Sequence, residues 1–341
     1  MSEIVGLYEI AQMAGVSTAA VNNWTRRYSD FPKPVVEVQA GKFYNEEQVN
    51  TWMRKRGKIM GANVISFINL KGGVAKTTTT VGTATLLAGE HGKKVLVVDL
   101  DPQTNCTTML IGEDKWKELN EAGYTLATLF NDSLKNTNKF DLDKTLQKNV
   151  SGIGNVRNLD LIPSSLDMID IQDKLVLMPQ GEFFSNNPTE ILRRAIKPII
   201  NNYDYVLVDC PPNMGLITLN GLRISGGYII PTIPDILSTY GIPQIINRVN
   251  KFSDNISEEI ECLGIVATKV RGQSSLHDRT LEILKREKDA PLFKTIFYEN
   301  NQIGEAAECV PVNTLRQKWG YQGQYARFND FACEIINLVE A

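Results

Sequence analysis

Residues 64–78, with the sequence VISFINLKGGVAKTT, decide the expected fold of the chain. The mostly apolar run Val64–Asn69 predicts a buried strand, and the apolar residues that follow Thr78 predict a helix. Between them lies a loop of small residues that begins at Lys71. A strand, such a loop and a helix in this order form a phosphate-binding loop, because backbone N–H groups and the positive end of the helix face the phosphate oxygens.

Every position of this loop has an expected role at a nucleotide. Lys76 would reach the β- and γ-phosphates, and the Thr77 hydroxyl would coordinate Mg²⁺. The predicted nucleotide-binding residues of the loop are Lys71, Gly72, Gly73, Val74, Ala75, Lys76, Thr77 and Thr78. A glycine-rich turn that caps an ordinary helix is the alternative, and the combination of strand, small residues, lysine and threonine favours the phosphate site.

Buried strands alternate with longer helices beyond residue 62. The expected strands are Val64–Asn69, Val95–Asp99, Leu159–Ile162, Tyr205–Asp209, Tyr228–Pro231 and Cys262–Thr268. Such alternation predicts an α/β domain, in which a mostly parallel sheet is flanked by helices on both faces. Two of these strands end in acidic residues, one at Asp99 with Asp101 close behind and one at Asp209. A carboxylate at a strand end can position the water that attacks a γ-phosphate, and Asp209 would hold Mg²⁺ through water.

The loop resembles the deviant Walker A motif of the ParA/MinD family of P-loop ATPases, whose distinguishing feature is an extra lysine at the start, here Lys71. The resemblance implies that Lys71 crosses to the nucleotide of a facing subunit, so that ATP binding and homodimer formation are one event. Ala75 stands where the family usually has glycine, and its Cβ would tighten the loop or slow hydrolysis.

Two further segments resemble the switch regions of this family. Residues 97–103, VVDLDPQ, resemble switch I, which implies that Asp101 positions the attacking water and that Asp99 lies nearer the metal. Residues 205–213, YVLVDCPPN, resemble switch II, in which Asp209 serves Mg²⁺. With ATP and Mg²⁺ as cofactors, the implied catalytic residues are Lys71, Lys76 and Asp101, and the implied metal-binding residues are Thr77, Asp99 and Asp209.

The resemblance is weaker in two later segments. Asn300 occupies a place where relatives contact the nucleotide, and Lys269 and Arg271 occupy places where relatives bind DNA without sequence preference. These two basic residues would otherwise be solvated surface charges. Tyr298 and Gln302 replace the usual proline and arginine of the second segment, which speaks against a DNA role there.

Residues 1–57 predict a small separate domain. Two short helices, the second one capped by Ser17, precede a hairpin at residues 35–44 and a helix at residues 46–56. This order resembles the winged helix-turn-helix of the MerR and excisionase type. In such a fold the residues that face DNA would be Thr18, Ala19, Asn22, Asn23, Arg26 and Arg27. A three-helix protein-interaction module is the alternative, and Trp24 and Trp52 are expected in the core.

The patterns along the chain predict a winged helix-turn-helix at 1–57, a linker at 58–62 and an ATPase domain at 63–341.

Composition and charge limit the function further. The formal net charge of -3 excludes a basic field across the whole chain, so DNA contacts would be local. The five cysteines have neither paired spacing nor a histidine cluster, which argues against disulfides or zinc and favours a reducing, cytoplasmic location. The sequence has no signal-like segment and no charge-free apolar run long enough to span a membrane.

These features together predict an ATP-dependent DNA partition ATPase. The protein would form a homodimer on ATP, bind nucleoid DNA and an operator, and be released when a centromere-binding ParB-type partner stimulates hydrolysis. An ATP-switched transcriptional repressor without a segregation role is the main alternative. A MinD-like membrane cycle is disfavoured, because residues 329–341 contain no lysine or arginine. An iron–sulfur reductase on the same scaffold stays open, because spacing alone does not place Cys106 and Cys210.

Overall fold

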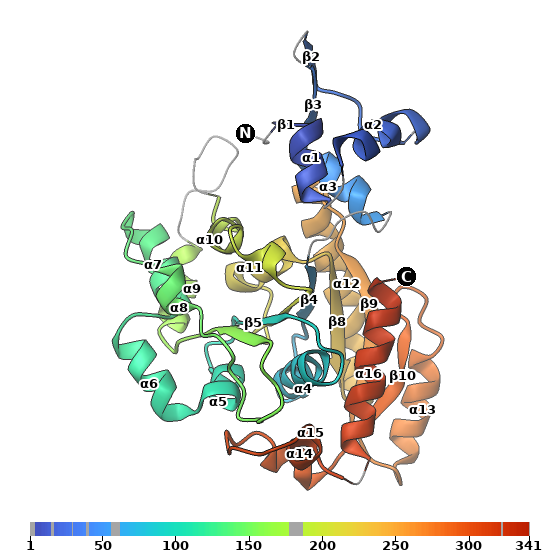
Figure 1. Ribbon diagram of the computed structural model, residues 1–341. Coiled ribbons are helices and arrows are strands. Elements are labelled where there is room, and N and C mark those ends of the chain that lie inside the picture. Colours follow the sequence, from blue (N-terminus) through green and yellow to red (C-terminus); the bar gives the residue numbers. More distant parts are fainter. Residues whose placement is uncertain are drawn as a thin grey trace. The chain divides into compact units, whose positions relative to one another are not determined.

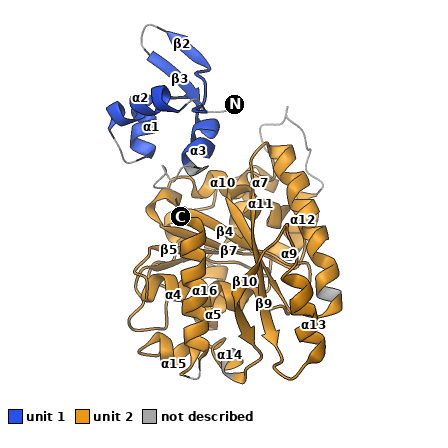
Figure 2. Ribbon diagram, turned by 90° about the vertical axis from the view of Figure 1, so that its right-hand side faces the viewer, with its two compact units in different colours: residues 1–62, 340–341 blue, residues 63–339 orange. Residues whose placement is uncertain are grey.

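The computed structural model describes residues 4–14, 17–28, 30–38, 41–55, 62–176, 187–321 and 323–340. The chain divides into two compact units, residues 1–62 with 340–341, and residues 63–339 (Figure 2). For six residues only the backbone is described: Arg54, Lys55, Leu237, Ser238, Gln302 and Ile303. Of the predicted linker 58–62, only Ala62 is among the described residues.

In its described residues, the small unit combines three helices with a three-stranded antiparallel sheet (Figure 2). The elements are β1 (Ile4–Gly6), α1 (Leu7–Met13), α2 (Thr18–Arg27), β2 (Val36–Val38), β3 (Gly41–Asn45) and α3 (Glu46–Lys55), with strand order β1-β3-β2. Ser17 caps α2, because its side chain accepts the N–H of Ala20 at 3.3 Å. The predicted cap, hairpin and last helix are therefore present, and β1 is a strand that the sequence pattern did not predict.

Aromatic side chains fill the core of the small unit. Phe31 packs edge-on against Tyr44 and Trp52, with ring centroids 5.4 and 4.7 Å apart. The ring of Trp24 lies 5.9 Å from that of Trp52. Trp24 and Trp52 are both buried, so their predicted place in the core is confirmed. Because α2 buries Trp24 and Val21 in this core, its opposite side is left to solvent.

Seven parallel strands form the sheet in the described part of the large unit (Figure 1). Their order across the sheet is β10-β9-β8-β4-β7-β5-β6. Their bounds are β4 (Asn63–Phe67), β5 (Val95–Asp99), β6 (Leu159–Ile162), β7 (Tyr205–Asp209), β8 (Gly227–Thr232), β9 (Glu261–Val270) and β10 (Leu292–Tyr298). The predicted parallel sheet is confirmed, and β10 is an additional edge strand. The central strand β4 lies between β7 and β8, so the loop after β4 lies beside the carboxyl ends of both neighbours.

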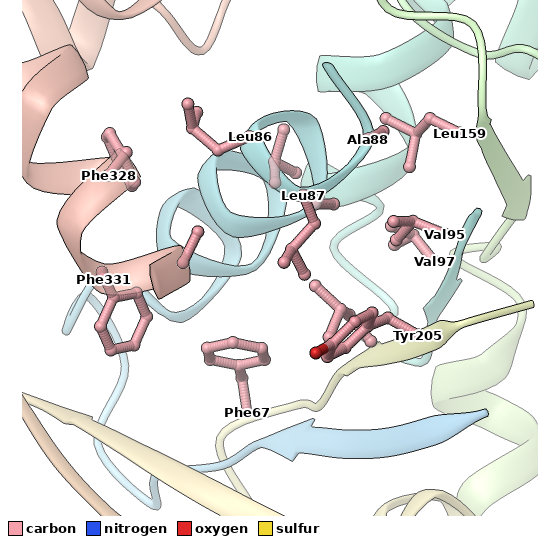
Figure 3. Packing of buried hydrophobic residues seen from close by; sticks show 14 of the residues in the cluster. Phe67, Leu86, Leu87, Ala88, Val95, Val97, Leu159, Tyr205, Phe328 and Phe331 are labelled. Atoms are coloured by element: carbon pink, nitrogen blue, oxygen red, sulfur yellow. The ribbon is translucent and has the colours of Figure 1, made fainter. Parts of the chain in front are cut away.

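One face of the sheet shares a hydrophobic core with four helices. These are α4 (Lys76–Gly89), α5 (Asn105–Ile111), α15 (Leu315–Trp319) and α16 (Gln324–Val339). Figure 3 shows Leu86 of α4 on the side of Phe328 in α16, and Leu87 on the side of Tyr205 in β7. The two helices approach so closely that a Cβ on Gly82 would lie 2.1 Å from the ring of Phe328. The helix that follows the phosphate-binding loop, α4, thus packs against α16 and against the sheet.

The opposite face is covered in part by α11 (Leu216–Ile224). A Cβ on Gly221 of this helix would lie 3.0 Å from Val208 in β7. Successive side chains of a strand point to opposite faces of the sheet, and the neighbouring Leu207 belongs to the core on the first face. Val208 therefore points to the face that α11 covers. The other helices are α6 (Glu113–Glu121), α7 (Leu126–Lys135), α8 (Leu142–Thr145), α9 (Met168–Leu175), α10 (Ile191–Ile196), a 3₁₀ turn (Ile200–Asn202), α12 (Ile236–Ile256), α13 (Ser275–Leu284) and α14 (Asn301–Glu305). None of the described helices combines the length and the apolar character needed to cross a bilayer.

Candidate functional site

The phosphate-binding loop joins β4 to α4 at the carboxyl edge of the sheet. β4 ends at Phe67, and α4 begins at Lys76. Gly73 and Ala75 both have left-handed backbone conformations, with φ of 75° and 63°. Glycine reaches this region freely, whereas the Cβ of alanine makes it unfavourable by about 1–2 kcal/mol. The φ of Ala75 therefore gives a physical reason why glycine suits this position.

Two side chains, one just after β4 and one near the end of β9, hold this loop in place. Asn69 accepts the N–H of Lys71 at 2.9 Å through Oδ1, and its Nδ2 donates to the carbonyl oxygen of Pro231 at 2.8 Å. From β9, the Thr268 hydroxyl donates to the carbonyl oxygen of Val74 at 2.9 Å. The sequence pattern assigned no role to Asn69, and it placed Thr268 only in a segment that resembles one where relatives contact the nucleotide base or DNA. Both residues lie near the end of a parallel strand, which is where ligands bind in such sheets.

The two lysines of the loop have different surroundings. Lys76 is buried, and its Nζ donates to the carbonyl oxygen of Lys71 at 3.2 Å. Burial lowers the pKa of Lys76, while the nearby carboxylates of Asp209 and Asp101 oppose this change by favouring the ammonium. Lys71 is more exposed, and its Nζ forms an ion pair at 2.7 Å with Asp235, another residue that the sequence pattern did not single out.

Thr77 and Asp209 present adjacent oxygen atoms at the start of α4. The Thr77 hydroxyl donates to Oδ2 of Asp209 at 2.7 Å, and the Thr80 hydroxyl lies 3.4 Å from Oδ1 of the same carboxylate. Asp209 is fully buried at the end of β7. Burial raises its pKa, with a smaller contribution from Asp101, and the hydroxyls oppose this effect. A divalent cation beside such a carboxylate would favour its charged form.

Asp99 holds the loop that carries Asp101. Oδ2 of Asp99 accepts the hydroxyl and the N–H of Thr107 at 2.6 and 2.9 Å, and Oδ1 accepts the N–H of Asp101 at 3.1 Å. Burial and the neighbouring Asp209 raise the pKa of Asp99 well above its usual range. Both oxygens of Asp99 thus have partners in the chain, and a role nearer the metal stays a prediction.

Asp101 lies at the rim of the same cluster. Its Oδ1 accepts the N–H of Gln103 at 3.0 Å, and its side chain is buried. Burial raises the pKa of Asp101, an effect that the Gln103 N–H and the Lys76 ammonium offset in part. A carboxylate whose pKa is raised is a better proton acceptor near neutral pH.

These residues fit a magnesium nucleotide. A Cβ added to Gly72 or Gly73 would meet no atom within 4 Å, so the loop faces open space. The hydroxyl of Thr77 and the carboxylate of Asp209 are the oxygen ligands that Mg²⁺ prefers. In the described part of the chain, no group of three or more His, Cys, Asp or Glu side chains is placed to hold a metal alone.

The structure places the predicted residues of the later segments near the ends of β9 and β10. Lys269 is exposed and has a left-handed backbone with φ of 49°. Arg271 is exposed and forms an ion pair with Glu299 at 2.6 Å. Asn300 is half-buried just after β10. The Glu299 carboxylate thus neutralises one of the two charges that the resemblance assigns to DNA.

The predicted DNA-facing residues of the small unit form one side of α2. All six are exposed: Thr18, Ala19, Asn22, Asn23, Arg26 and Arg27. Their spacing places them opposite the buried Val21 and Trp24. The guanidinium of Arg27 lies 5.8 Å from the ring centroid of Tyr28. α2 thus exposes two arginines and two asparagines together, and their contact with DNA stays a prediction.

Comparison with protein families and with individual proteins identifies relatives of the chain. The profile of the AAA domain family matches residues 62–262. The sporulation initiation inhibitor protein Soj of Bacillus subtilis (strain 168) is 30% identical over 243 residues, which cover 71% of this chain and 87% of Soj. The chromosome partitioning protein ParA of Myxococcus xanthus (strain DK1622) is 27% identical over 251 residues, or 74% of this chain and 80% of that protein.

Solved structures share the fold. A putative plasmid partition protein from Borrelia burgdorferi B31, bound to AMPPNP, has a TM-score of 0.57 and 21% identity, and covers 81% of this chain and 99% of its own. A cobyrinic acid a,c-diamide synthase from Mycobacterium smegmatis, with bound ATP analog and magnesium, has a TM-score of 0.61 and 21% identity over 81% of this chain and 94% of its own. The family profile and the Soj match, together with the loop and strand-end residues described above, show that the chain belongs to the ParA/Soj-like family of P-loop ATPases.

Proposed function

We propose that the protein is a Mg²⁺-dependent ATPase of the DNA partition type, which dimerises on ATP and binds DNA in that state. The observation that carries the proposal is the convergence of Lys76, Thr77, Asp101 and Asp209 beside an open phosphate-binding loop. These are the charges and oxygen ligands that binding and hydrolysis of a nucleoside triphosphate require. The matches to Soj and ParA support partition as the purpose.

Each residue of the site has one task in this proposal. The loop N–H groups and Lys76 bind the phosphates, and Thr77 and Asp209 hold Mg²⁺, which neutralises charge that develops on the phosphate oxygens. Asp101 orients the attacking water. Asp99 keeps Asp101 in position through its hydrogen bond to the Asp101 N–H. Asn300 lies near the carboxyl edge of the sheet, where it would contact the bound nucleotide.

Lys71 connects ATP binding to dimerisation in this proposal. To reach the nucleotide of a second subunit, its Nζ must leave Asp235. The Lys71 side chain is 39% exposed and the Asp235 side chain is 27% exposed. An ion pair this accessible to water contributes only about 0–1 kcal/mol to stability. Phosphate oxygens are therefore able to compete with Asp235 for the ammonium.

Lys71→Ala is expected to remain a monomer in the presence of ATP and Mg²⁺, because the variant has no ammonium to reach the nucleotide of the second subunit. Light scattering of the full-length protein measures the mass with and without ATP. Lys115→Ala is a matched control, since Lys115 is 44% exposed and paired with Glu118. An ATP-dependent dimer of unchanged mass in Lys71→Ala would remove the proposed role of Lys71 across the interface.

Two surfaces are proposed for DNA, one in each unit. Lys269 and Arg271 would bind phosphates without sequence preference, once DNA phosphates displace Glu299 from Arg271. The exposed side of α2 would read an operator as part of a winged helix-turn-helix, which would let the protein repress its own operon. A centromere-binding ParB-type partner would stimulate hydrolysis and release the protein from nucleoid DNA in the cytoplasm.

The test is binding of the full-length protein to a random-sequence duplex with ATP, with ADP and without nucleotide, at several salt concentrations. Binding is expected only with ATP and should weaken steeply with salt, because each neutralised phosphate releases counterions. The slope of the logarithm of the binding constant against the logarithm of the salt concentration should fall by about one unit in Arg271→Ala for each phosphate that Arg271 neutralises. Arg157 is exposed, and Arg157→Ala is expected to leave this slope unchanged. Binding that is indifferent to nucleotide would contradict the ATP-dependent dimer and would favour a simple repressor, in which ATP hydrolysis serves some other partner.

A further inference from the structure

We propose that Thr268 positions the phosphate-binding loop, by holding the peptide between Val74 and Ala75 so that its N–H points toward the nucleotide phosphates. This role rests on the proposed function, because it concerns the same ATP site. Thr268 belongs to β9 and is distant in sequence from the loop that it contacts. It acts through the loop backbone, which makes it a positioning residue.

The geometry of one peptide group carries the inference. The bond between Val74 and Ala75 is trans, so the Val74 carbonyl and the Ala75 N–H point in opposite directions. The Thr268 hydroxyl donates to that carbonyl at 2.9 Å. Fixing the carbonyl toward β9 therefore fixes the N–H away from β9. In a loop that binds phosphates with its N–H groups, this orientation decides whether the Ala75 N–H takes part.

The conformation of Ala75 makes this support important. With φ of 63° and ψ of 30°, Ala75 lies in the left-handed region that residues with a Cβ avoid. Such a conformation persists only where the surroundings over-determine it. The hydrogen bond from Thr268 supplies that restraint on the peptide preceding Ala75. A glycine would reach the same backbone conformation with less help.

Burial makes the hydrogen bond hard to replace. Thr268 is 1% exposed and Val74 is 0% exposed. Without the hydroxyl, the Val74 carbonyl would lose a partner where water has little access, which is costly for a buried acceptor. The loop would then populate conformations in which the carbonyl finds another partner and the Ala75 N–H turns away. The apparent affinity for ATP falls by the fraction of molecules that leave the binding conformation.

The experiment measures the dissociation constant of a fluorescent ATP analogue with Mg²⁺ for full-length variants, together with their thermal stability without nucleotide. Thr268→Val, which keeps the shape but lacks the hydroxyl, is expected to weaken binding by about tenfold. Thr268→Ser keeps the donor and is expected to bind within about threefold of the wild type, since only a methyl group is removed. Thr268→Ala is a second variant without the hydroxyl.

Thr295 on β10 offers a matched control. It is a buried threonine whose hydroxyl donates to Glu334 at 2.5 Å, and it belongs to the strand beside β9. Thr295→Val is expected to lower stability without a change in ATP affinity. If Thr268→Val and Thr268→Ala behaved like Thr295→Val, Thr268 would only tie β9 to the loop, and the proposed role would be wrong.

A double variant tests the link to Ala75 directly. In an Ala75→Gly background, Thr268→Val is expected to weaken ATP binding by less than in the wild type, because glycine no longer needs the restraint. An equal effect in both backgrounds would overturn the role that we assign to the left-handed backbone. If the wild type bound no ATP, the proposed function itself would be wrong. If the wild type bound ATP and Thr268→Val bound it equally well, only the proposed role of Thr268 would be wrong.

Discussion

Lys76→Ala is expected to reduce ATP affinity by at least about 100-fold while leaving the protein folded, since a charged donor to the phosphates is worth a few kcal/mol. The ammonium of Lys76 lies close to Asp209 and Asp101 at the buried end of the loop. Its removal takes away the positive charge that faces the phosphates and leaves these carboxylates to repel them. Titration with a fluorescent ATP analogue measures the change.

The variant is expected to fold, because the fold gains little from burying the Lys76 ammonium. Burial lowers the pKa of Lys76, which means that the folded chain disfavours its charged form. Circular dichroism and the melting temperature of Lys76→Ala check this point. A variant that is folded and still binds ATP as the wild type does would overturn the assignment of the phosphate-binding loop, and Lys115→Ala provides the comparison for the removal of a surface lysine.

Asp101→Asn is expected to bind ATP and to hydrolyse it about 10²- to 10⁴-fold more slowly, the range that a positioned acid or base contributes. The amide keeps an oxygen that accepts the Gln103 N–H, which the Asp101 carboxylate accepts at 3.0 Å, so the loop is expected to keep its shape. It loses the charge that orients the attacking water. Steady-state phosphate release gives the rate, and the ATP dissociation constant separates binding from turnover.

Two further variants sharpen this second prediction. Asp101→Ala removes the acceptor as well, and should be at least as slow as Asp101→Asn. Asp160→Asn changes a carboxylate on β6 that accepts the Tyr203 hydroxyl at 2.7 Å, far along the sheet from the loop after β4, and should leave turnover unchanged. Normal turnover by both Asp101 variants would assign the positioning of water to another group.

The sequence predicted six of the seven described strands of the large sheet and missed the edge strand β10. β5, β6 and β7 have the predicted bounds. β5 and β7 are continuous apolar runs up to their final aspartate, as expected for parallel strands covered on both faces, and Asp160 alone interrupts the apolar residues of β6. β10 was missed because its residues Leu292–Tyr298 include a lysine and a threonine and alternate between buried and partly exposed. An edge strand that is covered less completely does not produce the continuous pattern.

In the site, too, the residues that are contiguous in sequence were predicted, whereas contacts between distant segments were not. The run from Lys71 to Thr78 is contiguous, so its motif was visible in the sequence. The contacts that Asp235 and Thr268 make with the loop were missed because they depend on strand order, which places β8 beside β4 and β9 beside β8. Periodicity and motif spacing do not contain that order, and the physical role of each residue appears only when these strand ends meet.

The position of β4 in the sheet also governs how the chain acquires its activity. This strand is the first part of the sheet to leave the ribosome, yet its partners β7 and β8 are supplied by residues 205–209 and 227–232. Contacts so distant in sequence form slowly, because a long loop must close before they can stabilise anything. A nascent chain that ends before β7 therefore holds its nucleotide loop on an unpaired strand, and we expect the ability to bind ATP to arise only after more than half of the chain has been made.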